Sequence, residues 1–179
     1  MLDNDFLRLI IPTLSSSLTS AGVSGIAVKQ SMQPTSQGAN SGPTMYLHKV
    51  SEVRRGAQSV AEKYDAGQQA MIRTETQWME TVWQISAIIP QVPTDTESMT
   101  AADVLRLASM VMSSRALSDL LADNGAGILR ITDVRTPTAT DDHQRYIYAP
   151  NFDFTITHKF TTTSTVPVVD RTEYRLRRV

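Results

Sequence analysis

Hydrophobic residues recur with two different periods along this chain, and these periods predict a series of helices and strands. The first period is helical and joins these apolar positions: Phe6, Leu7, Ile10, Ile11, Leu14 and Leu18. Asp3 or Asn4 is suited to cap this helix, and we expect it to stop near Gly22. Pro12 lies inside the pattern and has no N–H donor, so a kink or a fresh start of the helix is expected there.

Alternation with period two follows and predicts strands in "GIAVKQ" (25–30), "MYLHKVSEV" (45–53) and "MIRTETQWMETVWQISAII" (71–89). The last of these is the clearest, with one apolar face made of Met79, Thr81, Trp83, Ile85 and Ala87. Because this segment is longer than an ordinary strand, we expect a bulge or a bend in it. A later strand has a similar face, formed by Phe152, Phe154, Ile156 and His158.

A helical period returns in residues 100–123. Thr100 and Asp103 have the spacing of a capping box, and the apolar stripe Val104, Leu107, Ala108 and Val111 follows them. The stripe loses phase at 113–115, which predicts two consecutive helices, the second capped by Ser113 or Ser114. The order of helix, strands, helix pair and strands predicts one α+β domain over residues 1–179, with helices packed on a mainly antiparallel sheet.

Three polar segments are expected to project from this domain. Residues 31–44 predict a long loop that contains Gly, Pro and Ser. Residues 54–70 show no clear period and predict an extended loop or a loose hairpin tip. Residues 161–179 are predicted to be prone to assembly, because "FTTTSTVPVV" (160–169) is rich in Thr and Val and suited to join another subunit's sheet edge.

Composition limits the function. The net charge is −1 and the isoelectric point about 6.3, which argues against tight binding of free DNA through many phosphate contacts. The absence of cysteine excludes disulfides, cysteine nucleophiles and thiolate metal sites. No apolar run has the length of a membrane span, and Asp3 and Asp5 before the first apolar stretch do not suit a secretory signal.

Motifs for catalysis are weak. No Gly-x-Ser-x-Gly sequence surrounds a serine, and "GAG" (125–127) precedes a strand, the wrong order for a phosphate loop. Asp141, Asp142 and His143 form the one cluster with metal-binding side chains, for which a solvated turn is the favoured alternative. We therefore expect no catalytic residue, metal or cofactor, and keep two alternatives: a metal-dependent enzyme, and an α+β binding module that uses its polar loops.

The basic end of the chain keeps a period of two. One face is charged and consists of Arg171, Glu173, Arg175 and Arg177. The other face consists of Thr172, Tyr174 and Leu176. This alternation predicts a docking strand rather than a DNA-binding tail. With Arg54 and Arg55, these residues are candidates for contacts between subunits, where acidic side chains such as Asp95 or Glu97 would be their partners.

The order of these segments resembles a known family. The resemblance rests on three features: the strand "TETQWMETVWQISAII", the broken helix "ADVLRLAS" and "LSDLLADNG", and the strand "APNFDFTI". From about residue 4 to 160 the chain resembles the neck and tail-terminator proteins of tailed bacteriophages, in particular the gateway type of contractile-tailed phages.

This resemblance implies a structural virion protein without catalytic residues. Such proteins form a closed ring, expected to be a hexamer, at the junction of head and tail. The implied partners are further copies of the chain, the head-side connector, the tail tube and the sheath. The genomic DNA would pass through the ring without sequence recognition, and the ring would form in the host cytoplasm.

Overall fold

A computed structural model describes residues 2–31, 42–90, 94–95, 97–140 and 146–167. Its helices are α1 (Asp3–Ser20), α2 (Ala101–Met112) and α3 (Arg115–Asp123). Its strands are β1 (Ala27–Gln30), β2 (Thr44–Asp65), β3 (Ala70–Ile88), β4 (Ala126–Ile131), β5 (Thr138–Thr140), β6 (Tyr146–Tyr148) and β7 (Asn151–Val166). The predicted polar loop 31–44 lies largely outside the described residues.

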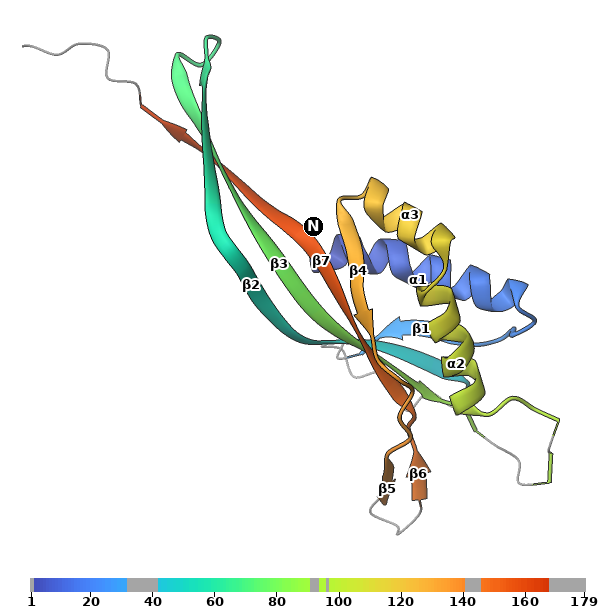
Figure 1. Cartoon of the computed structure of the whole chain (residues 1–179). Coiled ribbons are helices and arrows are strands. Elements are labelled where there is room, and N and C mark those ends of the chain that lie inside the picture. The colour runs from blue at the N-terminus through green and yellow to red at the C-terminus, as the bar shows by residue number, and fades with distance from the viewer. Residues whose placement is uncertain (1, 32–41, 91–93, 96, 141–145, 168–179) are drawn as a thin grey trace, which may run out of the picture.

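The main sheet has five strands in the order β1-β2-β3-β7-β4. Strand β1 is parallel to β2, and the other pairs are antiparallel. The three helices lie on one face of this sheet, while β5 and β6 form a separate small ribbon (Figure 1). The predicted α+β class, with a mainly antiparallel sheet, an N-terminal helix and a central helix pair, is confirmed.

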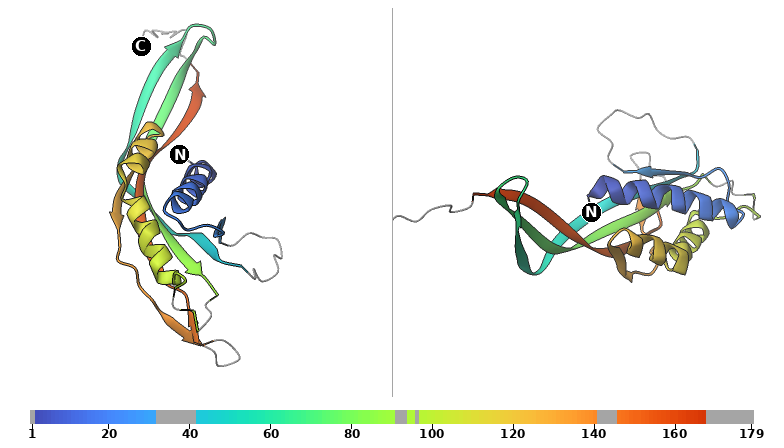
Figure 2. Two further views of the ribbon diagram at one scale, coloured as in Figure 1. Left: turned by 90° about the vertical axis from the view of Figure 1, so that its right-hand side faces the viewer. Right: turned by 90° about the horizontal axis from the view of Figure 1, so that it is seen from above.

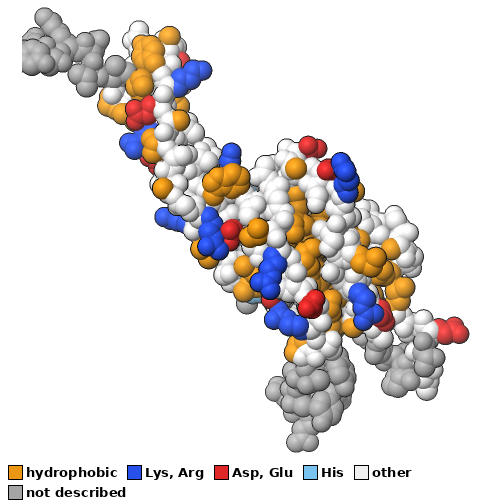
Figure 3. Space-filling model, viewed as in Figure 1, with side chains coloured by type: hydrophobic (Ala, Val, Ile, Leu, Met, Phe, Trp, Pro, Cys, Tyr) orange, Lys and Arg blue, Asp and Glu red, His pale blue; other side chains and the backbone are white. Residues whose placement is uncertain are grey.

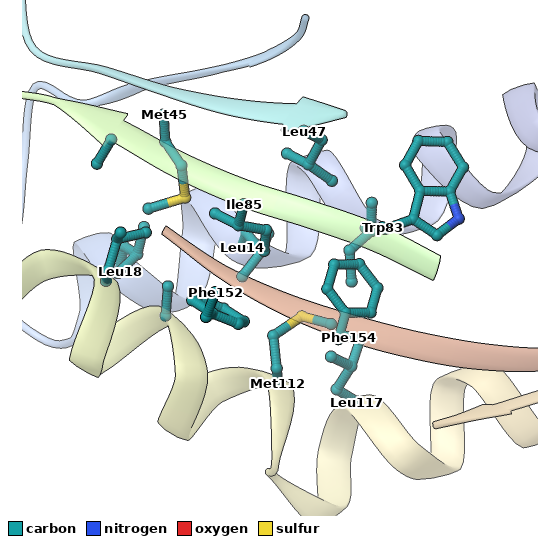
Figure 4. Close-up of a cluster of buried hydrophobic side chains, with 14 of the residues drawn as sticks. Leu14, Leu18, Met45, Leu47, Trp83, Ile85, Met112, Leu117, Phe152 and Phe154 are labelled. Atoms are coloured by element: carbon teal, nitrogen blue, oxygen red, sulfur yellow. The ribbon is translucent and has the colours of Figure 1, made fainter. Parts of the chain in front are cut away.

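The core fills the space between the helices and the sheet. Alternate residues of the central strands point into it, as the period of two predicts: Met79, Thr81, Trp83, Ile85, Ala87, Phe152, Phe154, Ile156 and His158 are all buried. They meet apolar side chains of the helices, among them Leu14, Leu18, Met112 and Leu117 (Figure 4). A fully buried leucine or phenylalanine of this kind contributes about 1.5–3 kcal/mol through the hydrophobic effect.

Helix α1 differs from its prediction at two points. The residue before its first turn is Leu2, whose N–H donates to the Asp5 carboxylate at 3.2 Å, so Asp3 and Asn4 are not the cap. The helix also continues through Pro12, and the predicted fresh start is wrong. Ile10 and Leu14 are fully buried on either side of this proline, and their packing offsets the missing backbone hydrogen bond.

The central helix pair forms as predicted. Thr100 accepts from the Asp103 N–H, and the Asp103 carboxylate accepts from the Thr100 N–H, so the capping box is confirmed. Ser114 caps α3 by accepting from the Leu117 N–H at 3.3 Å. The buried stripe of α2 is rotated from the predicted one, because Leu105 and Met112 are fully buried in addition to Val104 and Ala108.

Three strands continue beyond the helices as an arm. The arm comprises residues 52–65 of β2, 70–78 of β3 and 159–166 of β7, and it extends past the helices in every view (Figures 1 and 2). Of the two predictions for 54–70, the extended loop is wrong, because residues 54–65 are strand. A hairpin does form there, but its tip is only the turn at 66–69. Both faces of the arm lie in solvent, so no apolar period is expected along its strands. Pairing between the strands still satisfies their backbone N–H and C=O groups.

The predicted bulge occurs in the neighbouring strand. Strand β3 pairs with β7 in unbroken register, whereas β2 has irregularities between Lys49 and Ser51 and between Arg55 and Ser59. At the second bulge Gly56 has a φ of 68°, in the left-handed region that glycine adopts at little cost. The Gln77 side-chain amide donates to the Arg55 carbonyl at 2.8 Å, which fixes the bulge to β3.

Candidate assembly surfaces

The arm has two faces that differ in chemistry. Its helix-side face continues the face that the helices cover in the body, and its open face continues the uncovered side of the sheet. The register between β2, β3 and β7 assigns each residue to one of them. On the side seen in Figure 3, separate charged and hydrophobic side chains lie between uncharged polar ones along the arm.

The helix-side face of the arm carries alternating charges. Arg73 lies 3.0 Å from the Glu75 carboxylate and 3.9 Å from that of Glu62, and Gln58 donates to Glu75 at 2.7 Å. Near the body, this face is hollowed by a groove of about 350 Å³. Its lining residues are Glu52, Arg54, Gln58, Glu75, Gln77, Met79, Phe160 and Thr162. The face thus offers a polar groove next to an exposed aromatic ring.

The open face of the arm is rich in hydroxyl groups. Its described serines and threonines are Ser59, Thr74, Thr76, Thr161, Thr163 and Thr165. Charged side chains on this face are already engaged at its base. Arg55 forms an ion pair with Glu80 at 2.8 Å, and the Lys159 ammonium lies 4.9 Å from the centre of the Trp78 ring. Such a surface favours hydrogen bonds over strong attraction to one sign of charge.

Both outer strands of the arm have long stretches without a neighbour in the described sheet. Strand β4 pairs with β7 only from Phe154 to His158, which leaves residues 159–166 as an edge. Strand β1 pairs with β2 only from Thr44 to Leu47, which leaves 48–65 as the opposite edge. Edge strands of this length present backbone N–H and C=O groups that can pair with another chain.

The arm ends in a turn with fixed geometry. The Asp65 side chain accepts from the Gly67 N–H at 2.8 Å and from the Gln68 N–H at 3.4 Å. Gln69 has a φ of 50°, which completes the reversal into β3. Asx turns of this kind rigidify loop ends. The tip is therefore an ordered part of the arm.

The structure places only part of the predicted contact residues. Arg54 lines the groove, and Arg55 lies at the base of the arm in its ion pair with Glu80. The other predicted contact residues, Arg171, Glu173, Tyr174, Arg175, Leu176 and Arg177, lie outside the described residues. Residues 161–166, which we expected to join another subunit, pair along one edge with β3 of their own chain.

The expected metal cluster Asp141, Asp142 and His143 also lies outside the described residues. Within the described ranges, no three His, Asp or Glu side chains gather as metal ligands. No described helix has the length and apolar character needed to cross a bilayer. Asp95, an expected partner for arginines, accepts backbone N–H groups of Glu97 and Ser98, and these hydrogen bonds lower the pKa of its carboxyl.

Sequence reasoning missed the arm and its exposed aromatic residues. Trp78 and Phe160 are 49% and 41% exposed, respectively. A usable signal was available in three segments, 52–65, 70–78 and 159–166, all of which are rich in polar side chains. The pattern of one strand does not say which residues of the next strand it pairs with, so the three-stranded arm could not be predicted from these segments alone.

A family model described as "E217 gateway protein gp29" matches residues 5–168, which include both the body and the arm. The chain belongs to this gateway protein family. This finding confirms the resemblance to phage gateway and tail-terminator proteins. A comparison with curated proteins gives no match.

The fold of this gateway-family protein also resembles a solved structure of an extracellular contractile injection system, described as the PVC sheath/tube terminator in its extended state. The TM-score is 0.50 at 13% sequence identity, and the similarity covers 100% of this chain. The chain spans 64% of that protein's length. At this identity the similarity supports a shared fold.

Proposed function

We propose that this gateway-family protein is a structural component of the phage head–tail junction, where identical copies form a closed ring. The observation that carries the proposal is the family match over residues 5–168, which spans the helix-covered body and the arm together. The likeness to a sheath/tube terminator fold agrees with a place at the end of a contractile tail. The role needs shape and contacts, and no reaction is assigned to it.

The division into body and arm suits this role. The body has a continuous apolar core from Phe6 to Ile156, so one copy can fold without neighbours. The arm adds exposed faces and two free edges, and these surfaces contribute little to the folding of a single copy. A ring uses different patches on the two sides of each subunit and closes by rotation. We expect the arm to supply part of these patches, in a ring of six copies.

The proposed partners follow from the position in the virion. One side of the ring would contact the head-side connector, and the other the tail tube and the sheath. DNA would pass along the axis without base recognition. Contacts between subunits are assigned to Arg54 and Arg55 on the arm and to the C-terminal segment 171–177. The ring would form in the host cytoplasm before it enters the virion.

The test is the state of assembly of the full-length chain. Native mass spectrometry and negative-stain microscopy should find closed rings, either of the chain alone or after addition of tube or connector protein. Antibody labelling of virions should place the chain at the neck. A chain that stays monomeric with each of these partners and is missing from virions would contradict the proposal.

The double variant R54Q/R55Q sharpens this test at the arm. Both side chains are solvent-exposed, so the variant should keep its unfolding midpoint while ring formation becomes weaker. Arg106→Gln is the matched control, because Arg106 is also exposed and its ion pair within the described residues is with Asp103 of its own helix. Equal loss of rings in both variants would remove the specific role of the arm arginines.

A further inference from the structure

The two free edges of the arm are protected to very different degrees. The β2 edge has two bulges and carries charged side chains at Glu52, Arg54, Arg55, Glu62 and Lys63. The β7 edge at 160–166 runs in unbroken register and contains no charge, no proline and no glycine. Bulges, charges and prolines are the devices that keep edge strands from pairing. The β7 edge lacks them and is therefore open to another strand.

We propose that residues 160–166 of β7 receive residues 171–177 of a second copy as an additional strand. The proposal rests on the self-assembly proposed above and assigns it a specific pairing. The receiving segment is "FTTTSTV", and its side chains from Thr161 to Thr165 are all exposed. The β4 strand pairs only as far as His158 and leaves this stretch open.

Length and pattern match between the two segments. Seven residues of the edge face seven residues of the incoming segment, "RTEYRLR", and each spans about 23 Å as a strand. Both segments alternate two kinds of side chain with period two. Thr and Val are favourable cross-strand neighbours for Tyr and Leu, so Tyr174 and Leu176 gain contacts when they lie beside the threonines.

Charge decides which face the arginines take. The described helix-side face of the arm carries the carboxylates Glu52, Glu62 and Glu75 and the guanidinium groups of Arg54 and Arg73, an excess of one negative charge. The incoming charged face has three arginines and Glu173. The nearest of these carboxylates, Glu75, lies beside Thr162 of β7, two strand spacings or about 10 Å from an added strand, so the long arginine side chains extend toward it if this face lies on the helix side. The face with Tyr174 then lies on the open side beside Thr161, Thr163 and Thr165.

The sequence between the two segments favours a second copy over the same chain. To reach its own edge, the chain would have to reverse within "PVVD" (167–170). Pro167 restricts Val166 to extended conformations, and Val168 and Val169 are β-branched residues that prefer them. In a tight hairpin over these four residues Val168 and Val169 would take the two central positions, where Gly, Asn or Asp supply the positive φ that a β-branched residue disfavours. We therefore assign the incoming strand to a second copy.

The chain has no cysteine, so introduced cysteines give an unambiguous test. A Tyr174→Cys chain would be assembled with a second, differently tagged chain that carries Thr161→Cys, Thr163→Cys or Thr165→Cys. After mild oxidation we expect a disulfide between the two tagged chains, strongest for one of the three positions, because a strand has one register. Ser59→Cys is the control, since Ser59 is on the same open face but on the β2 edge.

Particle mass, measured on the same samples, separates the two proposals. Rings that contain the disulfide at one β7 position support both. Rings without it, or with an equal disulfide at Ser59→Cys, overturn the strand pairing and leave the proposed function intact. A chain with both Thr163→Cys and Tyr174→Cys that closes the disulfide within itself also overturns the pairing with a second copy. Absence of rings under all conditions overturns the proposed ring and this pairing together.

Discussion

Thr81 and His158 lie diagonally across the β3–β7 pair inside the core, with the Thr81 Oγ1 3.1 Å from the His158 Nε2. Both side chains are buried. Burial lowers the pKa of the His158 imidazole, because a charged ring would lose its hydration. The core therefore holds this histidine in its neutral form.

The lowered pKa predicts lower stability in acid. In the unfolded chain His158 has an ordinary pKa of about 6.5 and binds a proton more readily than in the folded chain, so stability falls as pH drops below that value. We expect His158→Gln to reduce this pH dependence, measured by urea unfolding at about pH 7.5 and about pH 5.5. Leu47→Ala, which destabilises the same core without removing a titratable group, is the control and should keep the wild-type slope. An unchanged slope in His158→Gln would contradict the prediction.

Strand β2 allows a test of the division between body and arm. Leu47 is fully buried in the body, whereas Val60 is 50% exposed in the arm. Leu47→Ala should lower the free energy of unfolding by about 2–5 kcal/mol because it leaves a cavity. Val60→Ala should cost less than about 1 kcal/mol in the same denaturant titration. Similar losses for both variants would contradict this division, because an exposed arm residue would then contribute as much as a core residue.

The bulge at Gly56 predicts a local effect. With a φ of 68°, Gly56→Ala should cost about 1–2 kcal/mol, since a side chain is disfavoured in that region. The loss should appear as faster hydrogen exchange in the arm and not in the helices. Gly127→Ala is the control, because an added Cβ there would meet the Thr157 hydroxyl at an ordinary 3.6 Å. Uniform loss of protection over the whole chain would argue against a local role.

The capping box of α2 predicts a loss of similar size in the body. Thr100→Ala removes the acceptor of the Asp103 N–H and should lower the free energy of unfolding by about 1 kcal/mol. Ser118→Ala, at an exposed position inside α3, should be neutral or slightly stabilising, because alanine is the better helix former. Thermal unfolding of both variants checks the difference. Equal midpoints would mean that water replaces the cap without loss.

The C-terminal segment predicts a change in assembly without a change in folding. Deletion of residues 171–179 should weaken ring formation and binding to neck partners while the unfolding midpoint stays within experimental error, because the core lies in the described body. Size-exclusion chromatography with light scattering and urea unfolding measure the two quantities. The full-length variant R171Q/R175Q/R177Q keeps the alternation of side chains, so it measures how much the arginine charges contribute to assembly. Unchanged assembly after the deletion would leave the segment as a solvated tail.

Local patterns determined much of this fold. The period of two in residues 79–87 and 152–158 located the buried faces of both central strands, since side chains alternate across a sheet. The capping box at Thr100 and the cap at Ser114 located two helix starts, because these signals act within one turn. The motifs of the broken helix and of the last strand were enough to indicate the gateway family.

Contacts between distant segments decided the rest. Whether 54–65 is a loop or a strand depends on its pairing with β3. Neither 52–65 nor 70–78 has an apolar period from which this pairing could be predicted. The free edge of β7 likewise depends on where β4 begins, because Ala126 pairs with His158, which is 32 residues later in the chain. The sequence by itself determined the buried faces and helix starts, since these depend on neighbouring residues. Only the tertiary structure decided the arm and its edges, because they depend on register between strands.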